Sequence, residues 1–385
     1  MNFNLSDEQQ QIADSLERLL TDHCSFEQRR AIAASEPGWS VGLWGQLAEL
    51  GVTALGIPEA FGGLGGGATD RLPVLQACGR ALLLEPYLAS SVLAATAVRE
   101  AGSNAQRDTL LPALASGELR MAFALDETTA RHEPLWVETR ARQTPQGWRL
   151  DGGKVLVLHG AHAHRLVVTA RTHGEPGDAD GRMLFLVDSQ AAGVALRDHR
   201  LIDDTAAAEL TLRDAVAEPL GDPADGARAR DAIAATLAAG TAAVCADMVG
   251  TMERAFALTT EYVNTRQQFG RAIGQYQALR HRIAEMAVQL ELARSLAIAA
   301  AVAADSPDTP ESAMDLPRAK LAIGRYARSL CQAAIQSHGG IGMTEEYAVG
   351  HCLRRVHVLD QLFGDVGAQA ARLVLMDSRL TPTSR

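Results

Sequence analysis

The stretch YVNTRQQFGRAIGQYQALRHRIAEM, residues 262–286, carries the most specific pattern in the sequence. A long helical pattern ends at Arg266, the residues QQFG form a turn, and a second helix begins near Gln275. Arg266 and Arg271 flank the turn with guanidinium groups that suit a pyrophosphate, and Phe269 could pack on a ring. The same arginines could instead cap the C-terminus of the first helix. The pattern alone leaves both interpretations open.

Helical periodicity continues on both sides of this stretch. One long helix is predicted over residues 227–265, and another begins near Gln275. A third is predicted over residues 317–337, where Gly339 suits a C-terminal cap. Helices of this length predict a bundle over residues 223–385, of a kind that often builds tetramer cores.

The first third of the chain is also helical in pattern, whereas the middle is not. From about residue 119, seven short alternating runs, among them KVLVLHG and MLFLVD, are separated by Gly, Asp and Pro. Such runs predict a compact antiparallel β domain. We therefore expect an α+β protein with an N-terminal α-helical domain at residues 1–117, a middle antiparallel β domain at residues 118–222, and the C-terminal helical bundle.

Composition disfavours several classes of function. The 385 residues carry a formal net charge of −10, which is unfavourable for an extended nucleic-acid surface. The five cysteines are scattered without a CxxC pair, which predicts reduced cytoplasmic thiols rather than disulfides or a metal site. The N-terminal MNFNLSDEQQQ has no basic and apolar leader pattern, and no apolar run is predicted to span a bilayer. We expect a cytoplasmic protein without a membrane span, a nucleic-acid partner or a metal.

Two C-terminal motifs resemble those of the acyl-CoA dehydrogenase family. The form YxxxRxQFGxxIxxxQ runs from Tyr262 to Gln277, and QxxGGxG runs from Gln336 to Gly342. The stretches LAELGVTALGIPEAFGGLG and LDGGKVLVLHGAHAHRLVVTAR are also similar to the family, so the resemblance covers nearly the whole chain. It implies an N-terminal helical domain, a middle β domain and a C-terminal four-helix bundle, with FAD between the β domain and the bundle. It also implies an acyl-CoA substrate, an electron-transfer flavoprotein as partner, and dimers paired into a tetramer.

The resemblance assigns contacts with FAD by position. The turn at residues 266–269 would meet the FAD of a neighbouring subunit. The glycine pair after Gln336 would lie along its ADP half, where the backbone must approach the ligand closely. The cofactor-binding residues implied in this way are Arg266, Gln268, Phe269, Gln277, Gln336, Gly339, Gly340, Leu125, Glu127, Leu156 and Leu158.

The segments expected to contact the flavin depart from the family pattern. The family's loop TEPxxGSD is DETTARHEP here, so Glu127 is kept while Arg131 and His132 replace a small Gly–Ser pair. The family's WIT strand is LVL at residues 156–158, which removes a Trp ring and a Thr hydroxyl. Arg131 and His132 could contact a polar or dicarboxylic substrate, although such residues in a loop are more often only solvated.

The stretch LDQLFGDVG, residues 359–367, differs from the family pattern at the position where the catalytic residue is expected. The family's reaction uses a carboxylate to remove the α-proton of an acyl-CoA thioester, while the β-hydrogen passes to the flavin as hydride. The resemblance places that glutamate at Phe363, which cannot take a proton. Its backbone N–H can still serve the thioester oxygen, and Gly364 beside it is expected to contact the substrate.

Other positions for the base are also unfavourable. Some family members place the glutamate on the helix before the RxQFG motif, which corresponds here to Gly240 or Thr241. Asp365 and Asp360 remain as weak candidates if the loop adopts another register.

The C-terminal segment HGGIGMTEEYAVGHCLRRVHVLDQLFGD resembles one branch of the family, which comprises the small subunit of pimeloyl-CoA dehydrogenase and similar heteromeric subunits. This branch implies an α2β2 heterotetramer in which a partner chain supplies the base. Two alternatives stay open: a self-sufficient homotetramer that uses Asp365 or Asp360, and a non-catalytic flavin-binding or assembly subunit.

Overall fold

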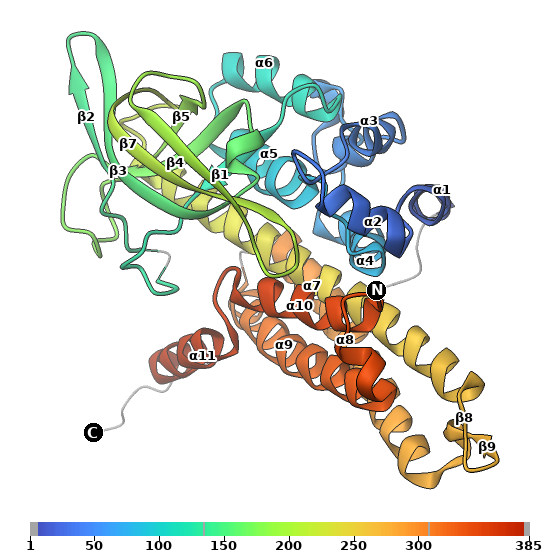
Figure 1. Cartoon of the computed structure of the whole chain (residues 1–385). Helices are drawn as coiled ribbons and strands as arrows, with labels where there is room; N and C mark the ends of the chain where they lie inside the picture. Colours follow the sequence, from blue (N-terminus) through green and yellow to red (C-terminus); the bar gives the residue numbers. More distant parts are fainter. Residues whose placement is uncertain (1–6, 134, 307–308, 381–385) are drawn as a thin grey trace, which may run out of the picture. The chain divides into compact units, whose positions relative to one another are not determined.

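The computed structural model describes residues 7–133, 135–306 and 309–380 (Figure 1). By its internal contacts the chain divides into two compact units. Unit 1 comprises residues 1–30, 71–83 and 241–385, and unit 2 comprises residues 31–70 and 84–240. The predicted segments 1–117, 118–222 and 223–385 follow the sequence order of helices and strands, whereas the two units follow packing.

The order of elements is helical, then β, then helical, as the sequence predicts. The helices are α1 (Asp7–His23), α2 (Phe26–Ala33), α3 (Val41–Glu49), α4 (Ala68–Ala81), α5 (Ala95–Ala101), α6 (Asn104–Ala115), α7 (Gly226–Thr265), α8 (Gln277–Asp305), α9 (Pro310–His338), α10 (Ala348–Gln361) and α11 (Val366–Leu380). The strands are β1 (Met121–Ala124), β2 (Arg140–Thr144), β3 (Gly147–Leu158), β4 (Arg165–Arg171), β5 (Arg182–Asp188), β6 (Val194–Arg200), β7 (Ala206–Pro219), β8 (Gln267–Gln268) and β9 (Arg271–Ala272).

Unit 2 contains a mixed sheet packed around an apolar core. Its strand order is β1-β4-β2-β3-β7-β5, with β6 paired to β7 and β4 paired to β5. Most pairs are antiparallel, as predicted, but β1 runs parallel to β4, with Met121 opposite Arg165. A parallel pair cannot be joined by a tight hairpin, so the alternation of β1 alone could not reveal its partner.

Local signals explain where the short helices of unit 2 begin. The Ser40 side chain accepts a hydrogen bond from Leu43 N–H at the start of α3. At the start of α6, Ser103 and Gln106 form a reciprocal capping box. Caps of this kind satisfy N–H groups that have no partner within the helix.

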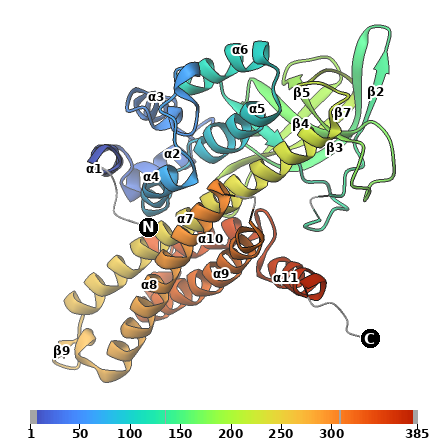
Figure 2. The ribbon, with the colours of Figure 1, turned by 180° about the vertical axis from the view of Figure 1, so that it is seen from behind.

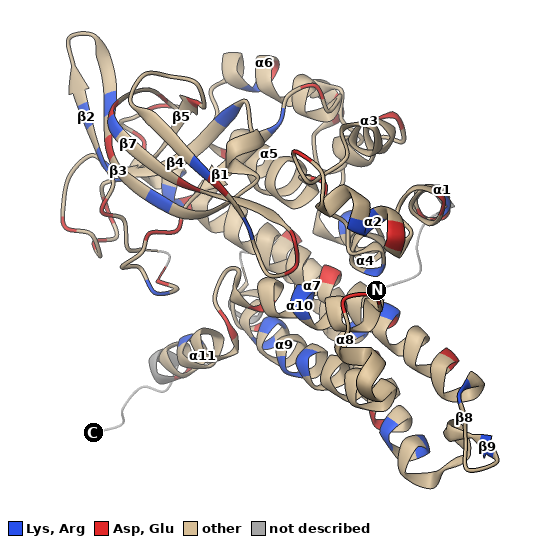
Figure 3. Ribbon diagram, viewed as in Figure 1, with Lys and Arg blue, Asp and Glu red and all other residues tan. Residues whose placement is uncertain are grey.

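Unit 1 is helical, and its bundle is built around α9. Helix α8 runs alongside α9 in both views (Figures 1 and 2), and α10 and α11 also contact α9. Helix α7 ends at Thr265 as predicted, whereas α9 begins before the predicted start, with Thr309 as its N-cap. Acidic and basic residues are interspersed along these helices (Figure 3).

Glycines allow α4 and α7 to cross closely within unit 1. A Cβ atom added at Gly250 would lie 1.9 Å from the carbonyl oxygen of Gln76, and one added at Gly79 would lie 2.1 Å from that of Asp247. Real Cβ atoms do not approach backbone this closely, so only glycine permits the crossing.

Two helices of the described chain, α7 and α8, are long and apolar enough to cross a membrane, whereas the sequence predicted no such run. The sequence prediction considered only the alanine-rich stretch LAIAAAVAAD, residues 296–305 of α8, as too short and too weakly hydrophobic to span a bilayer. In α7, 72% of the most apolar window is buried inside the fold, and in α8 39% is buried. Core helices pass the same test, so length and composition alone are a weak indication of a membrane span.

Candidate active site

The loop between α10 and α11 holds the position of the expected base in an unusual backbone conformation. Phe363 has φ +60° and Gly364 has φ +93°. A positive φ is uncommon for a bulky residue, so the surroundings must hold it. The buried side chain of Gln369 does so, because its amide donates to the carbonyl of Phe363 at 2.8 Å and to that of Gly364 at 3.3 Å.

Both aspartates near this loop are engaged in structural contacts. Asp360 is fully buried and accepts a 2.7 Å ion-pairing hydrogen bond from Arg328, and its main-chain carbonyl accepts a 2.8 Å bond from the buried Lys320. Asp365 caps α11 by accepting a 2.8 Å bond from the N–H of Ala368. Neither carboxylate is presented as a free base.

The alternative base position on α7 has no carboxylate. Gly240 and Thr241 are buried there. The next carboxylate along the helix is Asp247, which sequence reasoning did not single out. It is 4% exposed and forms a buried ion pair with Arg355, whose Nη2 lies 2.5 Å from Oδ2. This long-range contact left no signal in the local pattern.

The turn after α7 presents polar and aromatic side chains outward. Strands β8 and β9 form a small hairpin in which Phe269 has φ +52° and is 91% exposed. Arg266, Gln268 and Gln277 are also exposed, and no hydrogen bond from their side chains is recorded within the described chain. The arginine does not cap α7 through a recorded contact, so its guanidinium is available to a ligand or a neighbouring subunit.

The two C-terminal motifs meet through an aromatic stack. Tyr262, in the first motif, stacks on His338, in the second, with ring centroids 4.5 Å apart and planes 29° apart. On either side of His338 in the chain, Gln336, Gly339 and Gly340 are exposed. A Cβ atom added at either glycine would meet nothing within 4 Å, so open space lies beside this backbone.

Glu127 in unit 2 is the centre of a buried polar cluster. Its carboxylate accepts hydrogen bonds from Lys154 Nζ at 2.7 Å, from the Thr139 hydroxyl at 2.7 Å, and from two backbone N–H groups. Burial raises the pKa of this carboxyl, but Lys154 and the hydrogen bonds outweigh burial and hold the pKa below its usual value. These contacts indicate that Glu127 organises the loop and leave little capacity for a ligand.

The other residues expected near the flavin lie in the same unit. Leu156 has φ +54° at an irregularity of the β3–β7 pairing and is half-buried, while Leu158 and Leu125 are buried. Arg131 and His132 are exposed in a turn, with φ of +45° and +69°. The positive φ of Arg131 is a backbone conformation that the glycine expected at this position would adopt without strain.

The residues present are compatible with FAD. The FAD diphosphate needs cations and close backbone approach, and Arg266 with the open Gly339–Gly340 backbone supplies both within unit 1. The adenine or flavin rings need apolar surfaces, which the exposed Phe269 ring and the half-buried Leu156 offer. Among the described residues, no cluster of three or more His, Cys, Asp or Glu side chains could hold a metal ion.

Family models match nearly the whole chain. Residues 6–118 match the N-terminal domain of acyl-CoA dehydrogenases, residues 122–215 match the middle domain, and residues 230–373 match the C-terminal domain. The chain therefore belongs to the acyl-CoA dehydrogenase family of flavin-dependent oxidoreductases, as the motifs predicted.

Individual relatives span the full length. The probable acyl-CoA dehydrogenase YngJ of Bacillus subtilis is 28% identical, over 97% of this chain and 98% of the relative. Acyl-CoA dehydrogenase IpdE2 of Mycobacterium tuberculosis is 30% identical, over 92% and 93%. A chain in the crystal structure of the ChsE4–ChsE5 complex from Mycobacterium tuberculosis superposes with a TM-score of 0.87 at 25% identity, over all of both chains.

Proposed function

We propose that this chain is one subunit of a heteromeric FAD-dependent acyl-CoA dehydrogenase whose catalytic base comes from a second, dehydrogenase-like chain. The observation that carries the proposal is the loop at Phe363: no carboxylate stands at the family's catalytic position, and Asp360 and Asp365 are committed to Arg328 and to the α11 cap. The structurally similar ChsE4–ChsE5 assembly is itself a complex of two named chains. The sequence around the loop resembles the small subunit of pimeloyl-CoA dehydrogenase.

In this proposal the chain binds and orients rather than abstracts the proton. Arg266, Gln268 and Phe269, with the Gln336–Gly340 run, hold the FAD of a shared site. FAD, when bound, supplies the acceptor for the β-hydrogen of the acyl-CoA. The backbone around Phe363 and Gly364 is held by Gln369, so its N–H groups can be offered to the thioester oxygen without reorganisation.

The substrate would contact unit 2 through Arg131 and His132. Both are exposed and lie in the turn after Glu127, where the family has small residues. A guanidinium there favours a polar or dicarboxylic acyl group. Reduced flavin would then pass its electrons to an electron-transfer flavoprotein.

Purification alone and with a partner tests the proposal. We expect the chain alone to show no acyl-CoA-dependent bleaching of the flavin. Co-expression with a dehydrogenase-like chain that has a glutamate in this loop should give a stable complex with about one FAD for each pair of unlike chains. Full FAD loading and turnover by the chain alone would contradict the proposal, and a stable complex without flavin would indicate an assembly role.

A further inference from the structure

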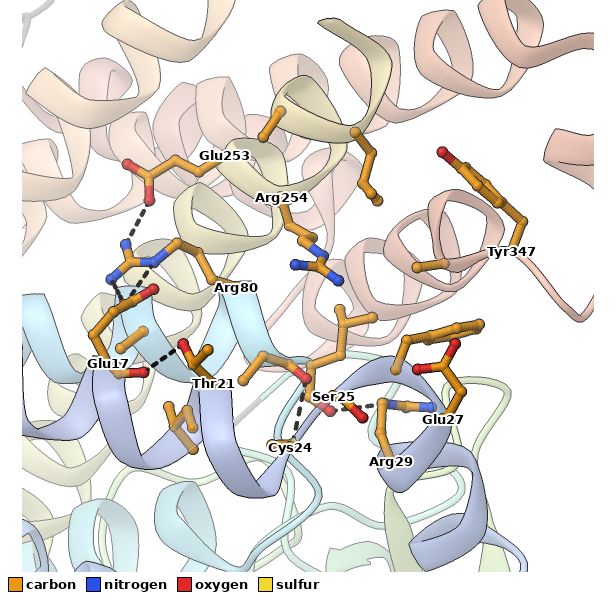
Figure 4. A pocket seen from close by; sticks show the side chains of 18 of the residues that line it. Glu17, Thr21, Cys24, Ser25, Glu27, Arg29, Arg80, Glu253, Arg254 and Tyr347 are labelled. Carbon is orange, nitrogen blue, oxygen red and sulfur yellow. Dashed lines mark hydrogen bonds and ion pairs between the residues drawn. The ribbon is translucent and has the colours of Figure 1, made fainter. Parts of the chain in front are cut away.

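Unit 1 contains a cavity of about 610 Å³ whose lining residues do not include any residue of the candidate active site (Figure 4). It is lined by the end of α1, the start of α2, the end of α4, the C-terminal third of α7 and the start of α10. All of these segments belong to unit 1. Its volume lies within the range of small-molecule sites, roughly 300–1,000 Å³.

Most of the charge on one wall of this cavity is already paired. Arg80 makes ion pairs with Glu17 at 2.7 Å and with Glu253 at 2.6 Å. Glu253 also accepts a 2.8 Å bond from Arg294. The opposite charges of these side chains neutralise one another, and their ion pairs hold this side of the cavity in place.

Arg254 is different, because it lines the cavity and has no recorded partner within the part of the chain that the structure describes. Figure 4 shows its guanidinium reaching from α7 into the space between Arg80 and Tyr347. The side chain is half-buried, and among the described residues no hydrogen bond or ion pair is recorded for it. Its five N–H donors are therefore available to an anion.

Tyr347 supplies a second donor beside this guanidinium. It lines the cavity, and its hydroxyl has no recorded hydrogen bond within the described chain. Burial raises the pKa of Tyr347, so the hydroxyl stays neutral and can donate. Contacts with His338 at 4.9 Å and Tyr262 at 6.4 Å between ring centroids hold its ring in place.

The other lining residues restrict the polarity and charge of the ligand that the cavity can bind. Leu20, Phe26 and Leu258 give the cavity an apolar portion. Glu27 and Glu346 are exposed carboxylates on its lining, which would repel a multiply charged anion such as phosphate. One unpaired cation beside an apolar wall matches a single carboxylate attached to a hydrocarbon chain.

We propose that this cavity binds an aliphatic monocarboxylate, with its carboxylate on Arg254 and Tyr347 and its chain against Leu20, Phe26 and Leu258. Within the described chain, none of these residues makes a recorded hydrogen bond to the loop at Phe363 or the turn at Arg266, and Tyr347 reaches the two cofactor motifs only through its ring contacts with Tyr262 and His338.

Isothermal titration of the purified, flavin-loaded protein with sodium hexanoate tests this site. We expect saturable binding that leaves the flavin absorption spectrum unchanged, since the probe does not enter the flavin site. Arg254→Gln should weaken hexanoate binding at least about tenfold, as expected for loss of a charge-assisted hydrogen bond. Tyr347→Phe should weaken it about threefold to tenfold. Uncharged 1-hexanol should bind at least about tenfold more weakly than hexanoate.

Arg372→Gln is the matched control, because it removes an exposed guanidinium on α11 outside the cavity and should leave the affinity unchanged. Equal affinity in Arg254→Gln and the unmodified protein would overturn the proposal, as would equal binding of 1-hexanol. A change of oligomeric state in Arg254→Gln, without hexanoate binding to the unmodified protein, would assign the cavity to a subunit contact and also overturn it.

Discussion

The side-chain amide of Gln369 donates a 2.8 Å hydrogen bond to the main-chain carbonyl of Phe363, across the start of α11. Gln369 is buried, and Phe363, whose carbonyl accepts the bond, has φ +60°. Helix α11 thus supports the backbone of the loop in which Phe363 stands at the expected catalytic position.

Replacing Gln369 tests this support. Gln369→Leu would leave the carbonyls of Phe363 and Gly364 without their side-chain donor, so we expect the free energy of unfolding to fall by about 1–3 kcal/mol. Hydrogen exchange at residues 362–365 should accelerate. Urea denaturation and exchange measurements give the two quantities. Gln332→Leu, at an exposed position of α9, is the control and should change the unfolding free energy by less than about 0.5 kcal/mol. Unchanged stability and exchange in Gln369→Leu would show that the loop does not depend on this contact.

Introducing a carboxylate at position 363 tests the proposal that this chain lacks the catalytic base and that a partner chain supplies it. Phe363→Glu keeps a non-glycine residue at the same positive φ, so the backbone conformation already accommodates it. In a flavin-loaded complex with a partner whose own loop glutamate is replaced by glutamine, we expect the Phe363→Glu complex to be bleached by a suitable acyl-CoA roughly 100-fold or more faster than the complex with the unmodified chain, because a positioned base contributes on this scale. Stopped-flow absorbance measures the rate. Phe363→Gln has the same size without a base and should not accelerate; equal rates for the two variants would contradict the assignment.

The Glu127–Lys154 pair predicts acid sensitivity of unit 2. The contacts of Glu127 hold its folded-state pKa below the unfolded value of about 4.3. Its stabilising contribution is therefore complete above that pH and is lost as the pH falls through the lower folded-state pKa. Glu127→Gln removes the carboxylate that pairs directly with the buried Lys154 ammonium, so we expect a loss of about 3–5 kcal/mol near neutral pH.

The measurement is the unfolding free energy from about pH 7 to pH 3. In Glu127→Gln the decline towards acid should be shallower than in the unmodified protein. Glu118→Gln removes an exposed carboxylate of the same unit and should leave both stability and slope nearly unchanged. A slope in Glu127→Gln as steep as in the unmodified protein would assign the acid sensitivity to other carboxyls.

Substitutions at two glycines, Gly250 and Gly340, distinguish an effect on protein stability from an effect on cofactor binding. Gly250→Ala places a Cβ atom 1.9 Å from the Gln76 carbonyl, so the α4–α7 crossing must open and stability should fall by about 2 kcal/mol or more. Gly340→Ala meets nothing within 4 Å, so the unfolding free energy of the flavin-free protein should stay within about 0.5 kcal/mol.

If FAD approaches the Gly340 backbone as proposed, Gly340→Ala should nevertheless weaken FAD binding. Fluorescence titration of the apoprotein with FAD measures the affinity, and thermal unfolding measures the stability of both variants. Normal FAD affinity in Gly340→Ala would remove this glycine from the proposed cofactor site.

Sequence by itself determined the elements whose signals are local. The end of α7 at Thr265, the turn at QQFG and the stop of α9 before Gly339 were all predicted, because helix ends are set by side chains and backbone within a few residues. The family motifs were also readable, since each lies within one continuous stretch. The absence of a carboxylate at Phe363 is likewise a property of the sequence alone.

Only the tertiary structure decided what the charged residues do. Glu127 meets Lys154 across 27 positions, Asp360 meets Arg328 across 32, and Asp247 meets Arg355 across 108. No local pattern encodes such partners, because burial of an ionic group is compensated by whichever opposite charge the packing brings close. The same packing pairs Asp360 with Arg328 and leaves Arg254 facing a cavity, because a side chain's long-range partners depend on which helices meet, and the sequence around each residue does not specify that.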